Sequence, residues 1–336
     1  MGPTDPGAGS APEPPPGRPY LPPPDIFVLP PRTNLPVSRG ARERRLSRIN
    51  RYDRRARLTS FETLTETGTV KLSFQVIDDE PFEFAPGYFV GIHADVPGHG
   101  VCRSPYCIVS SPEAAPAFEL LVRLVPEGPL SCYLANLAVG DVISFRGPSG
   151  KSMIPKESGT ELVLLATGVG IGPLLCLADH LAGQGFERPM RLYWGLRQVE
   201  DLCLLDQLDD VSRRHRDFSY LVSLSQPPPG WEGLHGRLTE SVPPLLDRLG
   251  GRHFYLIGNG AMIEEMRLAL SDLGVDDQLI YRETYFNVRH RPDPDVLAEI
   301  RSRFVARDLF SPYAHQEAGL FIPKKKASRG RREPPR

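Results

Sequence analysis

The chain has 336 residues, which is long enough for two domains of ordinary size together with terminal tails. With 40% hydrophobic and 24% charged residues it has a globular composition, and its net charge of -1 excludes a global attraction to nucleic acid or to an anionic membrane. The 36 prolines and 31 glycines are too many for one compact body, so part of the chain is expected to lie outside the folded domains.

The five cysteines are an odd number in a long chain, and the start of the sequence lacks the apolar stretch of a secretory signal. We therefore expect no disulfide framework and predict a cytoplasmic location. The longest apolar run, Leu162 to Ala178, is interrupted by glycines and a proline, which is typical of a strand, a turn and a helix. The sequence thus predicts no membrane span.

The first part of the chain is rich in proline and then in arginine. Residues 1–40 contain many prolines and few large apolar side chains, so they are predicted to form a disordered tail. Residues 41–57 are predicted to be a basic linker, because arginines dominate the segment from Arg42 to Arg57. The alternative is a short basic helix that docks an acidic partner.

Residues 58–155 contain short β-rich runs separated by turns with Gly and Pro. The runs are Val70 to Ile77, Tyr88 to Ala94, Phe118 to Val125 and Asp141 to Phe145. Their spacing predicts an antiparallel β-barrel.

Residues 156–287 alternate between apolar strands and helical segments. The predicted strands are Glu161 to Ala166, Met190 to Trp194, Tyr220 to Ser223, Phe254 to Ile257 and Gln278 to Tyr281, and Leu174 to Leu181 is a predicted helix. This alternation predicts an α/β domain with a doubly wound parallel sheet.

Residues 288–336 are predicted to be a C-terminal extension that ends in a basic tail. Within it, Asp295 to Arg307 carries apolar residues on one face and predicts a helix. The aromatic residues of the extension are expected to pack against the domains, and gating of a neighbouring pocket is the alternative.

A glycine-rich turn follows the first apolar strand of the α/β domain. It includes Thr167, Gly168, Gly170, Gly172 and Pro173 and leads into a helix. Glycines let the backbone approach a pyrophosphate closely, and the free N-H groups at a helix start favour its negative charge. The turn therefore predicts cofactor-binding residues, although glycines in a tight turn also serve packing alone.

With this turn, the order of the elements from Leu58 to Asn287 resembles the ferredoxin-NADP reductase family. In that family an antiparallel Greek-key FAD-binding barrel precedes a doubly wound NAD(P)-binding domain. The resemblance implies FAD and either NADPH or NADH as cofactors. It also implies an enzyme, an NAD(P)H-dependent flavoprotein reductase.

The stretch Ser104-Pro105-Tyr106-Cys107 resembles the family's Arg-Pro-Tyr-Ser motif, which binds FAD. The resemblance implies that Tyr106 packs on the isoalloxazine, with an ordinary barrel-core tyrosine as the alternative, and that Cys107 lies near flavin N5. Its thiol is a weaker donor than the family's hydroxyl. Ser104 stands at the family's arginine position and Arg103 one residue earlier, so Arg103 would reach the FAD pyrophosphate only through a bulge.

Three further segments match the family's cofactor motifs. Gly128, Pro129, Leu130 and Ser131 resemble the second FAD-phosphate segment, where the alternative is a serine helix cap. Arg197, in Tyr-Trp-Gly-Leu-Arg, resembles a contact with the nucleotide phosphates, and Arg237 is a second candidate for a 2'-phosphate. Gly258 and Met262 resemble the turn beside the nicotinamide, with Ile257 at the family's cysteine position.

The end of the α/β domain resembles the family's Glu-x-Phe/Tyr ending. It implies that Glu283 is an acid near the flavin and that Tyr285 and Phe286 are aromatic residues near its ring. With Tyr106 and Cys107, Glu283 and Tyr285 are the predicted catalytic residues.

We predict that electrons pass to a separate one-electron acceptor such as ferredoxin, flavodoxin or an oxygenase component. Cys102 and Cys107 have the spacing that opens a plant-type iron-sulfur motif, but no further cysteines complete it, and no histidines have metal-ligand spacing. A regulatory module with little turnover is the alternative, motivated by Ser104 and Ile257. Nucleic acid is not an expected partner, because basic runs beside a reductase core more plausibly steer an acidic protein.

Overall fold

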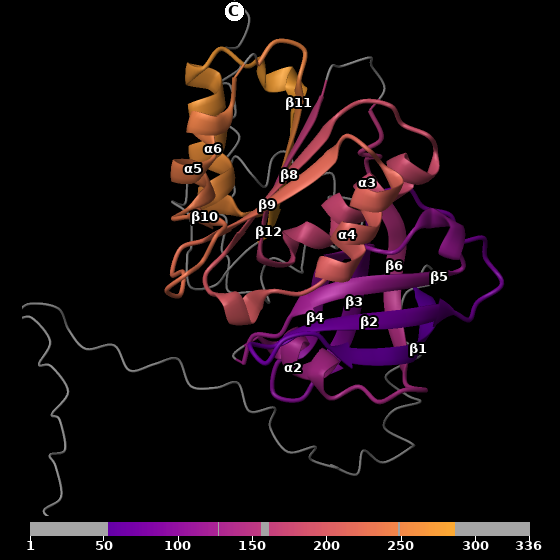
Figure 1. Ribbon diagram of the computed structural model, residues 1–336. Coiled ribbons are helices and arrows are strands. Elements are labelled where there is room, and N and C mark those ends of the chain that lie inside the picture. Colours follow the sequence, from indigo (N-terminus) through magenta and orange to yellow (C-terminus); the bar gives the residue numbers. More distant parts are fainter. Residues whose placement is uncertain (1–52, 127, 156–160, 248, 286–336) are drawn as a thin grey trace, which may run out of the picture.

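The computed structural model describes residues 53–126, 128–155, 161–247 and 249–285 (Figure 1). The predicted tail at 1–40, residues 41–52 of the predicted linker, Phe286 and the extension at 288–336 lie outside these residues. The described residues form two six-stranded sheets, which follow one another along the chain.

The first sheet is an antiparallel barrel, as predicted. Its strands are β1 (Arg54–Thr63), β2 (Thr69–Val76), β3 (Tyr88–Val96), β4 (Gly100–Cys107), β5 (Ala117–Arg123) and β6 (Val142–Gly150). They lie in the order β4-β3-β6-β1-β2-β5, and a bridge between Ile108 and Leu120 brings the two ends of the sheet together. Helix α2 (Pro129–Ala135) packs against β3 and β4, and its Leu130 and Leu134 belong to the barrel core. The 3-10 helix η1 (Pro112–Ala114) lies between β4 and β5.

The barrel begins earlier than the sequence indicated. Strand β1 starts at Arg54, so the last four residues assigned to the linker belong to the sheet. Arg54 alternates with Ala56 and Leu58, both fully buried, and its side chain therefore lies on the core side of the strand. The arginine-rich sequence predicts a solvated linker, but in the structure Arg54 packs at the end of the barrel.

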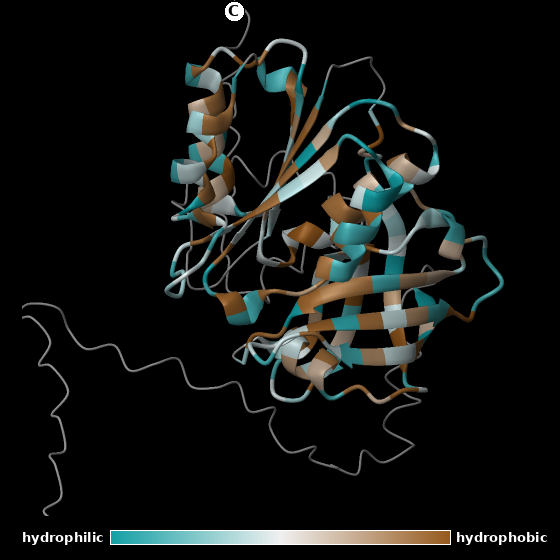
Figure 2. Ribbon diagram, in the orientation of Figure 1, coloured by the Kyte–Doolittle hydropathy of each residue, from teal (hydrophilic) through white to brown (hydrophobic). Residues whose placement is uncertain are grey.

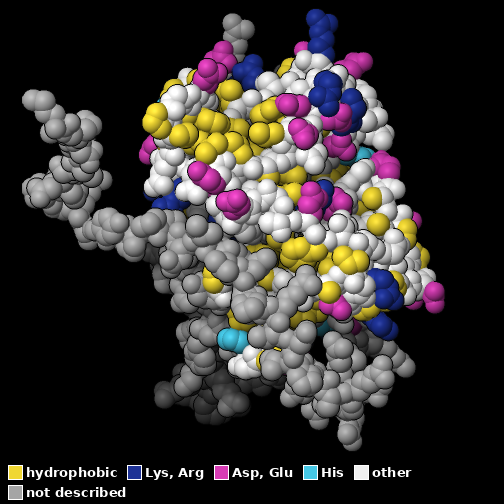
Figure 3. All heavy atoms as spheres, turned by 60° about the horizontal axis from the view of Figure 1, so that its bottom comes forward, with side chains coloured by type: hydrophobic (Ala, Val, Ile, Leu, Met, Phe, Trp, Pro, Cys, Tyr) yellow, Lys and Arg dark blue, Asp and Glu magenta, His cyan; other side chains and the backbone are white. Residues whose placement is uncertain are grey.

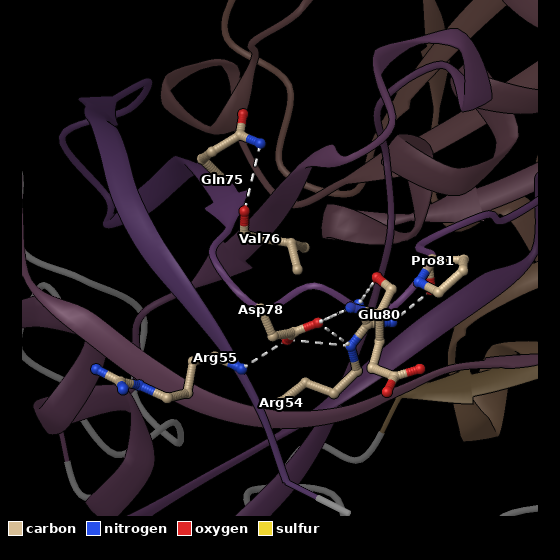
Figure 4. A network of polar contacts seen from close by, with 7 residues as sticks. All are labelled: Arg54, Arg55, Gln75, Val76, Asp78, Glu80 and Pro81. Carbon is tan, nitrogen blue, oxygen red and sulfur yellow. Dashed lines mark hydrogen bonds and ion pairs between the residues drawn. The ribbon is translucent and has the colours of Figure 1, made fainter.

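Several contacts hold Arg54 in this position (Figure 4). One guanidinium nitrogen donates to Asp78 Oδ1 and to the Glu80 carbonyl at 2.7 Å each, and another donates to the Pro81 carbonyl at 3.0 Å. The guanidinium carbon lies 5.2 Å from the centre of the Phe82 ring. The loop after β2 is thus tied to the first residue of β1.

The second sheet is entirely parallel, as predicted. Its strands are β7 (Leu162–Thr167), β8 (Met190–Leu196), β9 (Phe218–Leu224), β10 (Leu234–His235), β11 (His253–Asn259) and β12 (Ile280–Tyr285), in the order β10-β9-β8-β7-β11-β12. The α-helices are α3 (Ile171–Gly183), α4 (Leu205–Arg214), α5 (Leu238–Ser241) and α6 (Gly260–Asp272). The 3-10 helices are η2 (Gly168–Gly170), η3 (Val199–Asp201), η4 (Pro243–Leu245) and η5 (Asp277–Leu279).

Helices cover both faces of the parallel sheet, with α3 and α4 on one side and α5 and α6 on the other (Figure 1). Along β7, Leu162 and Leu164 pack into the core under α3, whereas Val163 and Leu165 pack into the core under α6. Figure 2 shows the resulting hydrophobic strands between the helices. Burial on both faces explains why this strand reads as a continuous apolar run.

The two domains share a packed interface through α3. A Cβ placed on Gly172 would stand 2.6 Å from Val109 Cγ1 and 3.3 Å from Leu121 Cδ2, so only a glycine lets α3 come this close to the barrel. The Cys176 thiol donates to the Ser110 carbonyl at 3.1 Å. Gly172 therefore fits the packing alternative for the glycine-rich turn.

None of the helices in the described part of the chain combines the length and the apolar character that a bilayer crossing requires.

Candidate active site

The end of β4 and the middle of β12 meet where the two domains touch. Cys107, the last residue of β4, donates its S-H to Glu283 Oε1 at 2.6 Å, across 176 positions of sequence. Cys107 is buried and Glu283 is partly buried. The structure thus brings together two predicted catalytic residues that come from different domains.

Three side chains of β12 line up at this point. Tyr281, Glu283 and Tyr285 alternate along the strand and so share one of its faces. The Tyr281 hydroxyl donates to Glu283 Oε2 at 3.5 Å, and the Tyr285 hydroxyl hydrogen-bonds Cys107. Tyr281 was missed in the sequence, although its position two residues before Glu283 on a strand is a signal for a shared face.

Burial controls the proton chemistry of this cluster. It raises the pKa of the Cys107 thiol well above its usual value, and the nearby Glu283 carboxylate raises it further. Burial likewise raises the pKa values of Tyr281 and Tyr285. The thiol and both phenols therefore keep their protons at neutral pH and act as donors.

The pKa of Glu283 is also raised, by burial, while the hydrogen bonds from Cys107 and Tyr281 oppose this effect. A raised carboxyl pKa moves toward neutrality, whereas raised thiol and phenol pKa values move away from it. Glu283 is therefore the group of the cluster best suited to exchange a proton near neutral pH.

Tyr106 lies on the opposite face of β4 from Cys107 and packs against the barrel core. Its register partner is the fully buried Val90, and burial raises the pKa of its hydroxyl. Ser104 shares this face with Tyr106.

Arg103 lies on the other face of β4. The pairing of β3 with β4 is continuous, with Arg103 opposite His93 and Tyr106 opposite Val90. The bulge that would have turned Arg103 toward the face of Tyr106 is absent from this strand pair. The regular alternation of a strand separates the two side chains, so the predicted contact of Arg103 with the FAD pyrophosphate lacks the geometry on which it depended.

The sequence analysis missed a polar cluster on that face. Asp53 Oδ1 lies 2.6 Å from Arg146 Nε, and its Oδ2 lies 3.2 Å from His93 Nε2. Burial lowers the pKa of His93; the negative Asp53 raises it, and the positive Arg146 and Arg103 lower it. No motif marks these residues, because they come together only through the pairing of β1, β3 and β6.

The predicted FAD-phosphate segment forms the start of α2. Gly128 precedes the helix, Pro129 is its first residue, and Ser131 Oγ accepts a hydrogen bond from the Val125 N-H at 3.0 Å. Ser131 is the third residue of the helix and Gly128 is its N-cap, without a side-chain cap bond, so the bond to Val125 does not match the predicted serine cap. Leu130 points into the barrel core, so it can offer a cofactor only its backbone.

The glycine-rich turn offers open space at one position. Gly168 has a φ of 53°, and an added Cβ would meet none of the described residues within 4 Å. At Gly170, by contrast, a Cβ would stand 2.4 Å from the Ile257 carbonyl oxygen. Gly168 therefore lies beside open space, which a bound dinucleotide requires. Gly170 instead allows close packing on β11. Pro173 is buried within α3.

Hydrogen bonds hold this turn against its neighbours. The Trp194 indole N-H donates to the Gly168 carbonyl at 2.9 Å, and the Thr167 hydroxyl oxygen accepts from the Asn259 N-H at 2.8 Å. Gly258, with a φ of 137°, leaves room for the Thr167 hydroxyl, which would lie 2.2 Å from an added Cβ. Trp194 and Asn259 were not among the predicted site residues.

The remaining candidates lie apart from the Cys107 and Glu283 contact. Met262 is buried in the core under α6. Arg197 is exposed after β8, where its Nε donates to Gln226 Oε1 at 3.1 Å, and Arg237 is exposed at the start of α5. Both arginines follow strands at the carboxyl edge of the sheet, where dinucleotides bind in such folds.

The site fits both expected cofactors. Open space at Gly168, at the carboxyl end of β7 and before α3, suits a nicotinamide dinucleotide. Tyr106 and the uncharged first turn of α2 suit FAD, whose reactive ring would lie beside the Cys107 and Glu283 pair.

Comparisons with known proteins agree with this arrangement. Residues 55–154 match the oxidoreductase FAD-binding domain, and residues 164–267 match the oxidoreductase NAD-binding domain. Ferredoxin-NADP reductase B of Sorangium cellulosum is 31% identical over 222 residues, which cover 64% of this chain and 91% of that protein.

One further relative is named as the electron transfer component of a dioxygenase, and one solved structure is named as a cytochrome P450 reductase. The toluate 1,2-dioxygenase electron transfer component of Pseudomonas putida is 29% identical over 231 residues, 68% of this chain and 67% of that protein. The crystal structure of a cytochrome P450 reductase from Amycolatopsis superposes with a TM-score of 0.62 at 26% identity, covering 69% of this chain and 70% of that one. The chain therefore belongs to the ferredoxin-NADP reductase family, as an oxidoreductase that binds FAD and a nicotinamide dinucleotide.

Proposed function

We propose that the protein takes a hydride from NADH or NADPH and passes the electrons singly to a separate protein. Ferredoxin, flavodoxin or an oxygenase component is the proposed acceptor. The observation that carries the proposal is the contact of Cys107 with Glu283 at the junction of the two domains. The proposed role of Glu283 there is to exchange a proton. The names of the relatives, a ferredoxin reductase and an oxygenase electron transfer component, support the acceptor class.

FAD, when bound, supplies the conversion of a two-electron hydride into single electrons. The proposed roles of the protein's residues are to position and to hold protons. Tyr106 covers one side of the flavin site, and Tyr285 the other. Cys107 keeps its proton as a donor, and Glu283 holds or releases a proton beside it.

For the nucleotide we propose that the pyrophosphate lies over the turn at Gly168. Thr167 and Gly258 support the proposal, because they hold the carboxyl ends of β7 and β11 at a fixed spacing. Arg197 and Arg237 would face the adenosine end, from strands on either side of β9.

A cytoplasmic location is part of the proposal. None of the five cysteines takes part in a disulfide, which suits a reducing compartment. On the face shown in Figure 3, acidic and basic side chains are interspersed. On that face, docking of an acceptor would depend on local shape more than on a field of one sign.

The test uses the purified full-length chain, reconstituted with FAD and reduced anaerobically by NADH or by NADPH. The flavin absorbance should bleach, and the reduced protein should then reduce at least one member of a panel of ferredoxins, flavodoxins and oxygenase components. Absence of bleaching with both nucleotides would overturn the reductase assignment. Bleaching followed by transfer to dyes but to no protein of the panel would overturn the proposed acceptor class.

A further inference from the structure

The two oxygens of the Glu283 carboxyl have different partners. Oε1 accepts from Cys107, which belongs to the barrel, and Oε2 accepts from Tyr281, which belongs to the same strand as Glu283. The carboxyl is therefore held from two sides. Its orientation toward the flavin site depends on a tyrosine that none of the family motifs includes.

Tyr281 is itself fixed by packing. Its ring lies 5.6 Å, centre to centre, from the ring of Tyr255 on β11, with an angle of 32° between the planes. The Tyr255 hydroxyl in turn donates to the carbonyl of Met153 at 2.9 Å, in the segment that follows the barrel. A contact across the domain interface thus braces the ring whose hydroxyl reaches Glu283.

The groups around Glu283 show why the hydrogen bond from the Tyr281 hydroxyl matters for its carboxylate. The titratable groups that face the cluster are Tyr281 and Tyr285 on β12, Cys107 on β4, Cys176 on α3 and Tyr255 on β11. Among the described residues no cationic side chain pairs with Glu283, and its neighbour Arg282 pairs with Asp277 at 2.8 Å. Hydrogen bonds are therefore what stabilises the carboxylate there.

The two donors differ in kind. A thiol is a weak hydrogen-bond donor and a phenol a stronger one, although the Tyr281 contact is the longer of the two. Hydrogen bonds to a carboxylate favour its charged form. Loss of the Tyr281 hydroxyl would leave the partly buried carboxylate with the thiol as its one donor among the described residues.

We propose that Tyr281 is the positioning residue for Glu283: its hydroxyl holds Oε2 so that Oε1 meets Cys107, and this hydrogen bond favours the charged form of the carboxyl. This inference rests on the proposed function, because it assigns a residue that acts through the proposed acid. Tyr281 does not itself need to contact either cofactor.

The test follows the S-H stretching band of Cys107 in the infrared spectrum of the full-length protein. Subtraction of the spectrum of Cys107→Ser isolates this band from those of the other four cysteines. Because the thiol donates to Glu283, the band should shift with pH as the carboxyl takes up a proton. In Glu283→Gln this pH dependence should vanish.

Tyr281→Phe keeps the ring that packs on Tyr255 and removes only the hydroxyl. The midpoint of the pH dependence should rise by about half a unit, because a carboxylate that loses a donor protonates more readily. The matched control is Tyr220→Phe on β9, which removes a tyrosine hydroxyl that donates to Asp209 of α4 at 2.6 Å. There the midpoint should not move.

An unchanged or lowered midpoint in Tyr281→Phe would overturn the inference, as would an equal rise in Tyr220→Phe. This readout needs no turnover. A protein that fails to oxidise NAD(P)H but shows the expected rise would refute the proposed function and leave the positioning of Glu283 standing.

Discussion

The hydroxyl oxygen of Thr167 accepts a hydrogen bond at 2.8 Å from the backbone N-H of Asn259, so one side chain joins the carboxyl ends of β7 and β11. Asn259 also caps α6, since its Oδ1 accepts from the Ala261 N-H at 2.9 Å. The turns that follow β7 and β11 are thereby fixed relative to each other.

Thr167→Val should weaken nucleotide binding, because it removes this hydrogen bond and leaves a backbone N-H without its partner. We expect a loss of about 1–2 kcal/mol in the free energy of unfolding and a several-fold rise in the Kd for NAD(P)H. Thr167→Ser keeps the hydroxyl and should behave almost as the wild type. Equal binding by the Val and Ser variants would show that the turn does not need this bond.

Gly172→Ala should destabilise the interface between the domains. The added carbon would stand 2.6 Å from Val109 Cγ1, and such overpacking costs about 1–3 kcal/mol. In the same helix, α3, a Cβ on Gly183 meets no atom of the described part of the chain within 4 Å, so Gly183→Ala should be neutral or stabilising. Urea unfolding of both variants measures the difference, and a stable Gly172→Ala would contradict the packing role.

Cys107→Ser should lower the pKa of Glu283, because a hydroxyl donates more strongly to a carboxylate than a thiol does. A group with a lower pKa keeps its negative charge to a lower pH, so the acid limb of the pH profile of kcat should move to lower pH. Cys203→Ser changes a partly buried thiol away from this contact and serves as the control. A limb that moves to higher pH would show that the thiol is the better partner.

The polar cluster around His93 predicts a loss of stability in acid. The pKa of His93 is lowered from 6.5 in the folded protein, chiefly by burial. The unfolded chain therefore binds a proton at a higher pH than the folded one, and stability should fall as the pH drops below about 6.5. Urea midpoints measured between pH 5 and pH 8 should show this fall in the wild type and a smaller one in His93→Gln. Equal slopes would exclude His93 as the cause.

The elements with a strong pattern could be predicted from the sequence. The apolar run of β7 and the Gly-rich turn after it identified the parallel sheet, since burial on both faces leaves a continuous hydrophobic signature. The sequence analysis missed strand β1 because an arginine, Arg54, occupies a position that faces the core. The contacts that hold Arg54 there come from Asp78 and Phe82, which lie far along the chain.

The candidate site was predictable only in part, because its contacts are long-range. Cys107 and Glu283 were singled out by motif resemblance, but their direct contact follows from the packing of two domains. Tyr281 carries no motif and becomes visible only once the face of β12 is known. The Arg103 contact stays a prediction: the sequence shows the one-residue shift, and the strand register places Arg103 on the other face of β4 from Tyr106.

Helix α3 packs closely against the barrel, and this packing affects how substrates can enter. Gly172 allows the contact, and the bonds from Cys176 to Ser110 and from Tyr255 to Met153 fasten the domains on either side of it. Contacts of this kind oppose a movement that would separate the two domains. Access for the nicotinamide would then depend on the side chains at the junction of the domains and not on separation of the domains.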